Sequence, residues 1–150
     1  IFKQKRLTLK QYNVKKTIII VNKQKFVERR AKLKRLVKEG IVIIFGNNES
    51  PCNYPANAYY PFRQDSSFLY YFGQKRDGLI GVIDIDNDIE TLVGDDIDIE
   101  DIVWYGSVDS VHDLAEAVGV ANTAPMKTIK TICANAMGKT GGFTSFLHTG

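Results

Sequence analysis

The spacing of apolar residues changes along the chain, and each spacing predicts an element. Residues 25–39 carry apolar side chains at helical intervals, and Gly40 suits the end of that helix because glycine tolerates a left-handed backbone. The next run, IVIIF at 41–45, is apolar throughout and predicts a strand covered on both faces.

An aromatic stretch follows a long polar segment. Residues 46–65 are rich in Pro and Asn, so we expect an irregular loop. In residues 66–72, SSFLYYF, alternation predicts a strand with Phe68, Tyr70 and Phe72 on one face. We interpret these aromatic residues as core.

Two further strands and two helices complete the pattern. Residues 78–86 and 89–94 flank a polar turn and predict a hairpin. Residues 110–119 and 125–137 show helical spacing, each with a residue suited to a helix start. The order of elements predicts one α/β domain with a mixed β-sheet flanked by helices.

Positive charge is concentrated at the start of the chain. Residues 1–39 contain 14 Lys/Arg and 2 Asp/Glu, whereas residues 40–150 contain 6 and 15. We interpret residues 1–24 as a basic leader without regular structure. A nucleic-acid-binding arm is the alternative, but the interleaved aromatic residues of a single-strand binder are missing, so nucleic acid is not an expected partner.

Composition also bears on the compartment. Cys52 and Cys133 lie far apart, without a CxxC pair or a Cys/His cluster, which predicts a reduced, intracellular protein with a cytoplasmic location; one disulfide between the two is the alternative. No apolar run approaches the roughly 20 residues of a membrane span, so no membrane contact is expected.

Motifs for metal binding and catalysis are incomplete. Residues 84–95 alternate Asp and Ile but lack the Gly and the Glu that a calcium loop needs. The acidic stretch 95–106 predicts a turn and a short element that buries Trp104. His112 and His148 lie near no nucleophile motif. We therefore predict no catalytic and no metal-binding residue in this chain.

The stretch NYPANAYYPFRQDSSFLYYFG, residues 53–73, resembles a pattern in the amino-terminal domain of Xaa-Pro aminopeptidases and prolidases. That domain belongs to the creatinase/prolidase superfamily. The pattern is a loop rich in Asn and Tyr-Pro, then Phe-Arg-Gln, then an aromatic segment ending in Gly73. The resemblance covers about residues 25–137.

The resemblance implies an α/β domain that precedes a separate catalytic domain. That second domain carries two metal ions, commonly manganese, and removes an amino-terminal residue preceding proline. The implied role of this chain is non-catalytic: subunit contact in a homo-oligomer, and shaping of a neighbouring active site for proline-containing peptides. Its partner is then the catalytic domain of the same parent chain, and the chain alone should be inactive. An aminopeptidase parent and a prolidase parent both stay open.

Within this resemblance, Tyr60, Arg63, Gln64 and Asp65 are the predicted contacts with substrate or with a neighbouring subunit. The planar fork of Arg63 suits a carboxylate. The alternative is that Arg63 only ties the loop together, because a long loop needs side-chain hydrogen bonds to satisfy its backbone.

Both ends depart from the family pattern. Residues 138–150 form an atypical tail, with FTSFLHTG where the family has a strand of the type His-Phe-Leu-Pro-Pro-Tyr-Arg. We hypothesise a frameshift there, and translated upstream sequence in residues 1–24. Codons that cannot yield the family strand in another frame would sink this hypothesis. A stand-alone protein- or peptide-binding module without peptidase activity is the alternative function.

Overall fold

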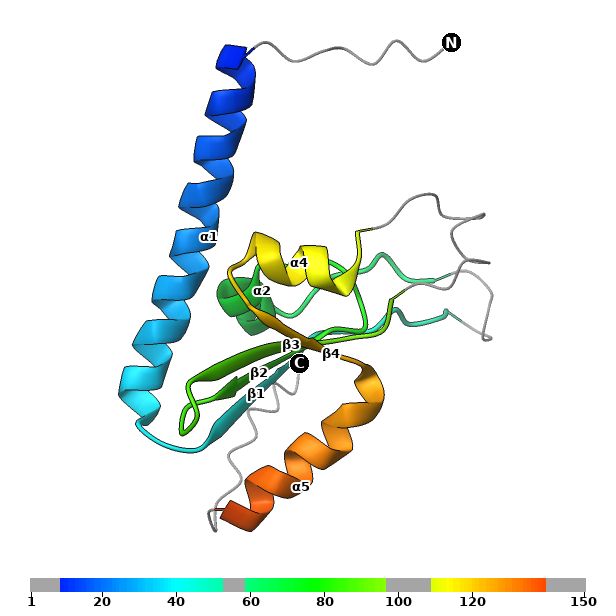
Figure 1. Cartoon of the computed structure of the whole chain (residues 1–150). Coiled ribbons are helices and arrows are strands. Elements are labelled where there is room, and N and C mark those ends of the chain that lie inside the picture. Colours follow the sequence, from blue (N-terminus) through cyan, green and yellow to red (C-terminus); the bar gives the residue numbers. More distant parts are fainter. Residues whose placement is uncertain (1–8, 53–58, 97–108, 140–150) are drawn as a thin grey trace.

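The computed structural model describes residues 9–52, 59–96 and 109–139. A four-stranded sheet lies between helices on both faces (Figure 1). In chain order, the elements are α1 (Leu9–Val37), β1 (Ile41–Phe45), α2 (Ser66–Phe72), β2 (Ile80–Asp84), β3 (Ile89–Val93), α4 (Val111–Ala117), β4 (Asn122–Ala124), the 3-10 helix η1 (Met126–Thr128) and α5 (Ile129–Lys139).

The sheet is mixed, with the strand order β1-β2-β3-β4. β1, β2 and β3 are successively antiparallel, and β4 runs parallel to β3 after the crossover through α4. The predicted fold class is therefore confirmed, as is the hairpin, which is β2–β3. β4 was not predicted, because three residues give too short a pattern and parallel pairing depends on a distant strand.

α2 corrects the prediction of a strand at 66–72. The carboxylate of Asp65 caps the helix by accepting the Phe68 N–H at 2.8 Å, and Gly73 ends it with a left-handed φ of 65°. Phe68 and Phe72, four residues apart, are both fully buried. The aromatic residues fit a period of two and a helical period equally, and the cap residues decide for the helix.

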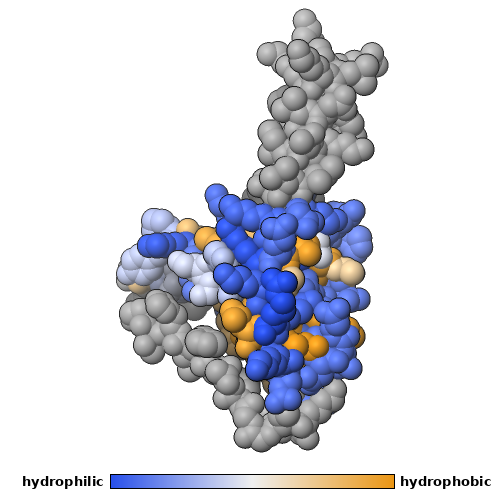
Figure 2. Space-filling model, turned by 90° about the vertical axis from the view of Figure 1, so that its left-hand side faces the viewer, coloured by the Kyte–Doolittle hydropathy of each residue, from blue (hydrophilic) through white to orange (hydrophobic). Residues whose placement is uncertain are grey.

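α1 is longer than predicted. It begins at Leu9 instead of Lys25, so residues 9–24, which we expected to lack regular structure, are helical. That segment has neither Gly nor Pro and is rich in Lys and Gln, which favour helices. Figure 2 looks onto the α1 side, where hydrophilic residues cover most of the coloured surface.

A buried arginine fixes α1 to the rest of the domain. Arg30 is fully buried, and its Nε donates to Glu90 Oε2 at 2.6 Å. Its two Nη groups donate to the carbonyls of Tyr71 and Val118, both at 2.9 Å. Lys34 adds an ion pair with Glu90 at 2.7 Å. One guanidinium thus joins α1 to the ends of α2 and α4 and to β3.

Two apolar clusters lie on opposite faces of the sheet. The first packs α1, α2 and α4 against the sheet, and its fully buried members include Phe68, Phe72, Leu79, Ile83 and Leu92. The second lies beneath α5 and is smaller, with Ile80, Val82 and Val93 as its buried members.

The strand predicted at 41–45 is confirmed as β1, and apolar clusters pack on both of its faces, with Val42 and Ile44 in the first cluster and Ile41 and Ile43 in the second. β1 is at the edge of the sheet and pairs only with β2 among the described strands. Ile41 and Ile43 are half-buried, and Phe45 keeps 50% of its surface exposed. A continuous apolar run does not tell an edge strand from a central one.

The helices predicted at 110–119 and 125–137 are confirmed as α4 and as η1 followed by α5. Ser110 caps α4 and exchanges hydrogen bonds with Asp113 in a capping box. Trp104, His148 and all of the tail beyond residue 139 lie outside the described residues. No helix in the described ranges has the length and apolar character needed to cross a membrane.

Candidate functional site

The predicted contact loop lies at the end of the sheet that is formed by the carboxyl ends of β1, β3 and β4. β1 and β3 run in the same direction because each is antiparallel to β2, and β4 is parallel to β3. Their carboxyl ends therefore lie together at one end of the sheet, and open α/β sheets commonly bind ligands just outside the carboxyl ends of their strands. The described parts of the loop, residues 46–52 and 59–65, follow β1 at this end.

The two arms of the loop pair with each other. Pro51 and Tyr59 form an antiparallel bridge, and the Tyr60 N–H donates to the Ser50 carbonyl at 3.0 Å. Tyr59 and Tyr60 keep 47% and 59% of their surfaces exposed. The pairing thus presents two neighbouring tyrosines to the outside of the domain.

Gln64 holds the loop to the sheet. Its side chain is buried, with 5% exposed, and its Oε1 accepts the backbone N–H groups of Asn47 at 2.6 Å and Asp65 at 2.9 Å. Its Nε2 donates to the Arg76 carbonyl at 2.7 Å. One amide therefore joins the end of β1, the start of α2 and the turn before β2.

The four predicted contact residues divide into two pairs. Gln64 and Asp65 turn inward, as loop anchor and as cap of α2. Tyr60 and Arg63 have exposed side chains, and the Arg63 carbonyl accepts from Asn47 Nδ2 at 2.8 Å. The loop is thus tied partly through the backbone of Arg63. The role of all four as contacts with substrate or subunit stays a prediction.

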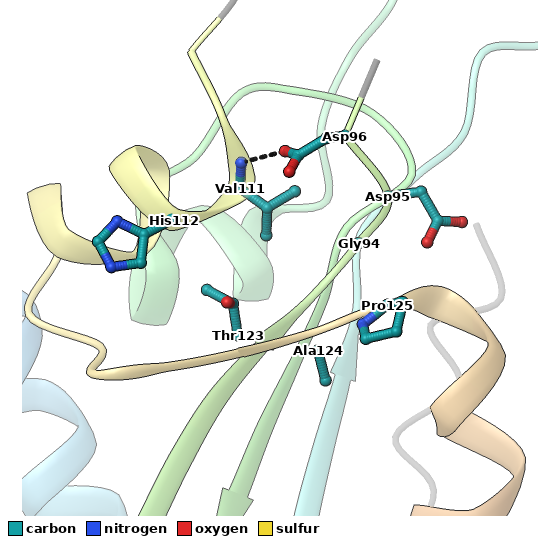
Figure 3. A pocket seen from close by; sticks show the side chains of 8 residues that line it. All are labelled: Gly94, Asp95, Asp96, Val111, His112, Thr123, Ala124 and Pro125. Atoms are coloured by element: carbon teal, nitrogen blue, oxygen red, sulfur yellow. Dashed lines mark hydrogen bonds between the residues drawn. The ribbon is translucent and has the colours of Figure 1, made fainter. Parts of the chain in front are cut away.

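A cavity of about 210 Å³ lies at the same end of the sheet, between the end of β3, the start of α4 and the end of β4 (Figure 3). Two acidic residues of the predicted turn line it. Asp96 Oδ1 accepts the Val111 N–H at 2.6 Å, and Asp95 Oδ1 accepts the Met126 N–H at 2.9 Å. Each carboxylate satisfies a backbone donor at the start of a helix, α4 for Asp96 and η1 for Asp95. Their acidity therefore serves as capping.

Arg76, which the sequence analysis did not single out, connects the loop with this cavity. Its carbonyl accepts from Gln64, and its Nη2 donates to the carbonyl of Asp95. Its Nη1 is buried and has no hydrogen-bond partner among the described residues. The signal in the sequence is a basic pair, Lys75 and Arg76, in the otherwise acidic later part of the chain.

His112 and Asp113 stand at the start of α4 beside the cavity. Hydrogen bonds from the hydroxyl and the N–H of Ser110, with a smaller effect of His112, hold the pKa of the Asp113 carboxyl below its usual range. His112 is exposed. Within the described ranges, no group of three His, Cys, Asp or Glu side chains is arranged to hold a metal ion. The carboxyl end of the sheet thus has a surface of hydrogen-bonded loops with exposed aromatic and basic side chains.

Comparison with solved structures shows the fold class to which this arrangement belongs. Escherichia coli aminopeptidase P in its low-pH form matches with a TM-score of 0.64 and 24% identity, over 75% of this chain and 26% of that chain. A variant of the same enzyme in complex with substrate matches with a TM-score of 0.67 and 22% identity, over 77% and 27%. The domain therefore has the fold of the creatinase/prolidase amino-terminal domain.

The family follows from the sequence comparison. The model of "Aminopeptidase P, N-terminal domain" matches residues 26–143, so this chain belongs to that family. The human Xaa-Pro dipeptidase is 26% identical over 115 residues, which are 77% of this chain and 23% of that protein. The chain thus spans about a quarter of the length of the relatives that it matches. The resemblance expected over residues 25–137 is confirmed.

Proposed function

We propose that this chain is the non-catalytic amino-terminal domain of a metal-dependent Xaa-Pro aminopeptidase, which contacts a neighbouring subunit and helps to shape the active site there. The observation that carries the proposal is the family match over residues 26–143 in a chain spanning only about a quarter of its relatives. The rest of such a protein has room for a catalytic domain.

The partners in this proposal are the catalytic domain of the same parent chain and further copies of that parent. Two manganese ions belong to the catalytic domain, and when bound they supply Lewis-acid chemistry for hydrolysis. A cytoplasmic location is part of the proposal and is supported by the free thiols of Cys52 and Cys133. An Xaa-Pro dipeptidase parent is consistent with the same observations.

Tyr60 and Arg63 are the outward-facing residues that this role would use. Tyr60 is 59% exposed, and exposed aromatic residues are enriched at protein interfaces. The guanidinium of Arg63 suits a carboxylate, either a peptide terminus or an acidic side chain of a neighbouring subunit. Gln64 and Asp65 contribute by fixing the loop that presents these two side chains.

Two measurements test the proposal. Incubation of this chain with manganese and an Xaa-Pro peptide should give no hydrolysis, and turnover by the chain alone would contradict a non-catalytic role. The nucleotide sequence over roughly one domain length beyond residue 150, of about 100–200 residues, should encode Asp, His and Glu metal ligands in one of the three frames. Unrelated sequence in every frame would contradict the proposal.

A stand-alone peptide-binding module is the second candidate, and the adjacent exposed Tyr59 and Tyr60 favour it. Titration of a proline-containing peptide into the chain, followed by NMR, separates the two functions. The peptidase proposal predicts no saturable binding, because most of the peptide-binding site then lies in the catalytic domain. Saturable binding that Arg63→Ala removes and Lys75→Ala leaves intact would support the module instead.

A further inference from the structure

β1 exposes one edge of its backbone. The Ile85 N–H donates to the Gly40 carbonyl and the Gly46 N–H to the Leu79 carbonyl, both at 2.9 Å. Residues 40 and 46 therefore direct their backbone groups toward β2. Hydrogen-bonded positions alternate along an antiparallel pair, so every even-numbered residue between them does the same. The odd-numbered residues of β1 direct theirs to the outer side.

These outward positions are Ile41, Ile43 and Phe45. Their N–H and C=O groups face no strand among the described residues, because β1 ends the strand order. Their side chains share one face of the sheet, the face beneath α5, where Ile41 and Ile43 belong to the apolar cluster. Phe45, at the end of the strand, is 50% exposed.

Edge strands are usually protected by charged residues, by proline or by a bulge. β1 has none of these: its five residues are all apolar, and its register with β2 is continuous. Two more exposed apolar residues, Leu36 at 69% and Val37 at 41%, end α1 just before it. Such an edge can accept another strand.

We propose that β1 pairs with β1 of a second copy of this chain, antiparallel and about a twofold axis at Ile43. In that register Ile43 faces Ile43 of the second copy, and Ile41 faces Phe45. The Ile43–Ile43 pair and the two Ile41–Phe45 pairs then join residues with outward backbone groups, so each is a hydrogen-bonded pair. The two four-stranded sheets become one continuous sheet. The half-exposed Phe45 packs beside Ile41 of the second copy.

β1 can pair with β1 of a second copy because the strand is apolar along its whole length, so apolar residues face each other in the antiparallel register. Every facing pair within residues 41–45 is apolar. Beyond the strand, the same register brings Glu39 opposite Asn47 and Lys38 opposite Asn48, so no like charges meet. The inference concerns the β1 edge alone and does not depend on the proposed peptidase role.

Sedimentation equilibrium of the 150-residue chain over a wide concentration range tests this pairing. We expect a reversible monomer–dimer equilibrium. Phe45→Lys should raise the dimer dissociation constant at least about tenfold, because it places an ammonium against an apolar residue at two symmetric positions. Ile43→Pro should do the same by removing an outward N–H, which an edge strand tolerates without unfolding. Circular dichroism checks that both variants stay folded.

Ile89→Lys is the matched control. Ile89 is 45% exposed on the same face of the sheet, but β2 separates it from the β1 edge. This variant should leave the dissociation constant unchanged. A chain that stays monomeric at every concentration would overturn the proposal. Equal weakening by Phe45→Lys and Ile89→Lys, or growth beyond the dimer, would overturn it too, since pairing consumes the β1 edge.

Discussion

The two faces of the sheet differ in how completely they are covered. Under α1, α2 and α4, the large apolar residues Phe72 and Leu92 are 0% exposed. On the opposite face, α5 covers the middle of the sheet, and Phe45 and Ile89 remain 50% and 45% exposed. The closed face therefore holds the larger of the two apolar clusters, whereas the open face leaves apolar area for contact with another surface.

The largest expected effect separates the two faces directly. Phe72→Ala removes a buried ring that stacks on Phe68 at 5.4 Å, and should lower the free energy of unfolding by about 3–5 kcal/mol. Phe45→Ala on the open face should change it by less than about 1 kcal/mol in the monomer. Urea unfolding at low protein concentration measures both. Equal losses would contradict the distinction between the faces.

The next effect concerns the arginine of the closed face. Arg30→Met leaves the carbonyls of Tyr71 and Val118 without their donor and removes one of the two cations paired with Glu90. It should lower the free energy of unfolding by about 3 kcal/mol. Arg29→Met is the matched control. Arg29 is half-buried and donates to one carbonyl, that of Tyr70, so its loss should cost about 1 kcal/mol. A similar cost for both would show that Arg30 does not anchor α1.

A smaller effect is expected at the cap of α2. Asp65→Ala removes the acceptor of the Phe68 N–H and should lower the free energy of unfolding by about 1 kcal/mol. Ser66→Ala, at the exposed neighbouring position, should have almost no effect. Thermal unfolding of the two variants measures the difference. Identical melting temperatures would contradict the capping role.

The smallest effect lies at the rim of the closed face and depends on pH. The ion pair with Lys34, at 2.7 Å, holds the pKa of Asp88 below its ordinary value of 3.8. Because the folded-state pKa is depressed, the contribution of Asp88 is present above pH 3.8 and is lost as the pH falls through the lowered pKa. Unfolding midpoints of the wild type and of Asp88→Asn should therefore differ slightly near neutrality and converge in acid. A difference that grows in acid would contradict this sign.

The sequence predicted the elements whose signals are local. The β2–β3 hairpin follows from its alternation and polar turn, and α4 from its spacing and from Ser110. α2 was misassigned because alternating aromatic residues also fit a helix, although Asp65 and Gly73 carried the correct signal. β4 and the edge position of β1 depend on which distant strands pair, and no local pattern encodes that choice.

The candidate site shows the same limit. The stretch around Arg63 was found through its resemblance to a family pattern, and the family is confirmed. The inward roles of Gln64 and Asp65 could not be read from it, because they depend on partners as distant in sequence as Asn47 and Arg76. Arg76 was missed because its link to Asp95 forms only when β2 and β3 pair.

Hydrogen exchange along β1 is the most direct test of the claim that this edge strand, which borders the open face, pairs with β1 of a second copy of the chain. The outward amides of Ile41, Ile43 and Phe45 should exchange fast in dilute protein and slow markedly as its concentration rises. The amides of Val42 and Ile44, already bonded to β2, should show no such dependence. Fast exchange of the outward amides at every concentration would contradict the account.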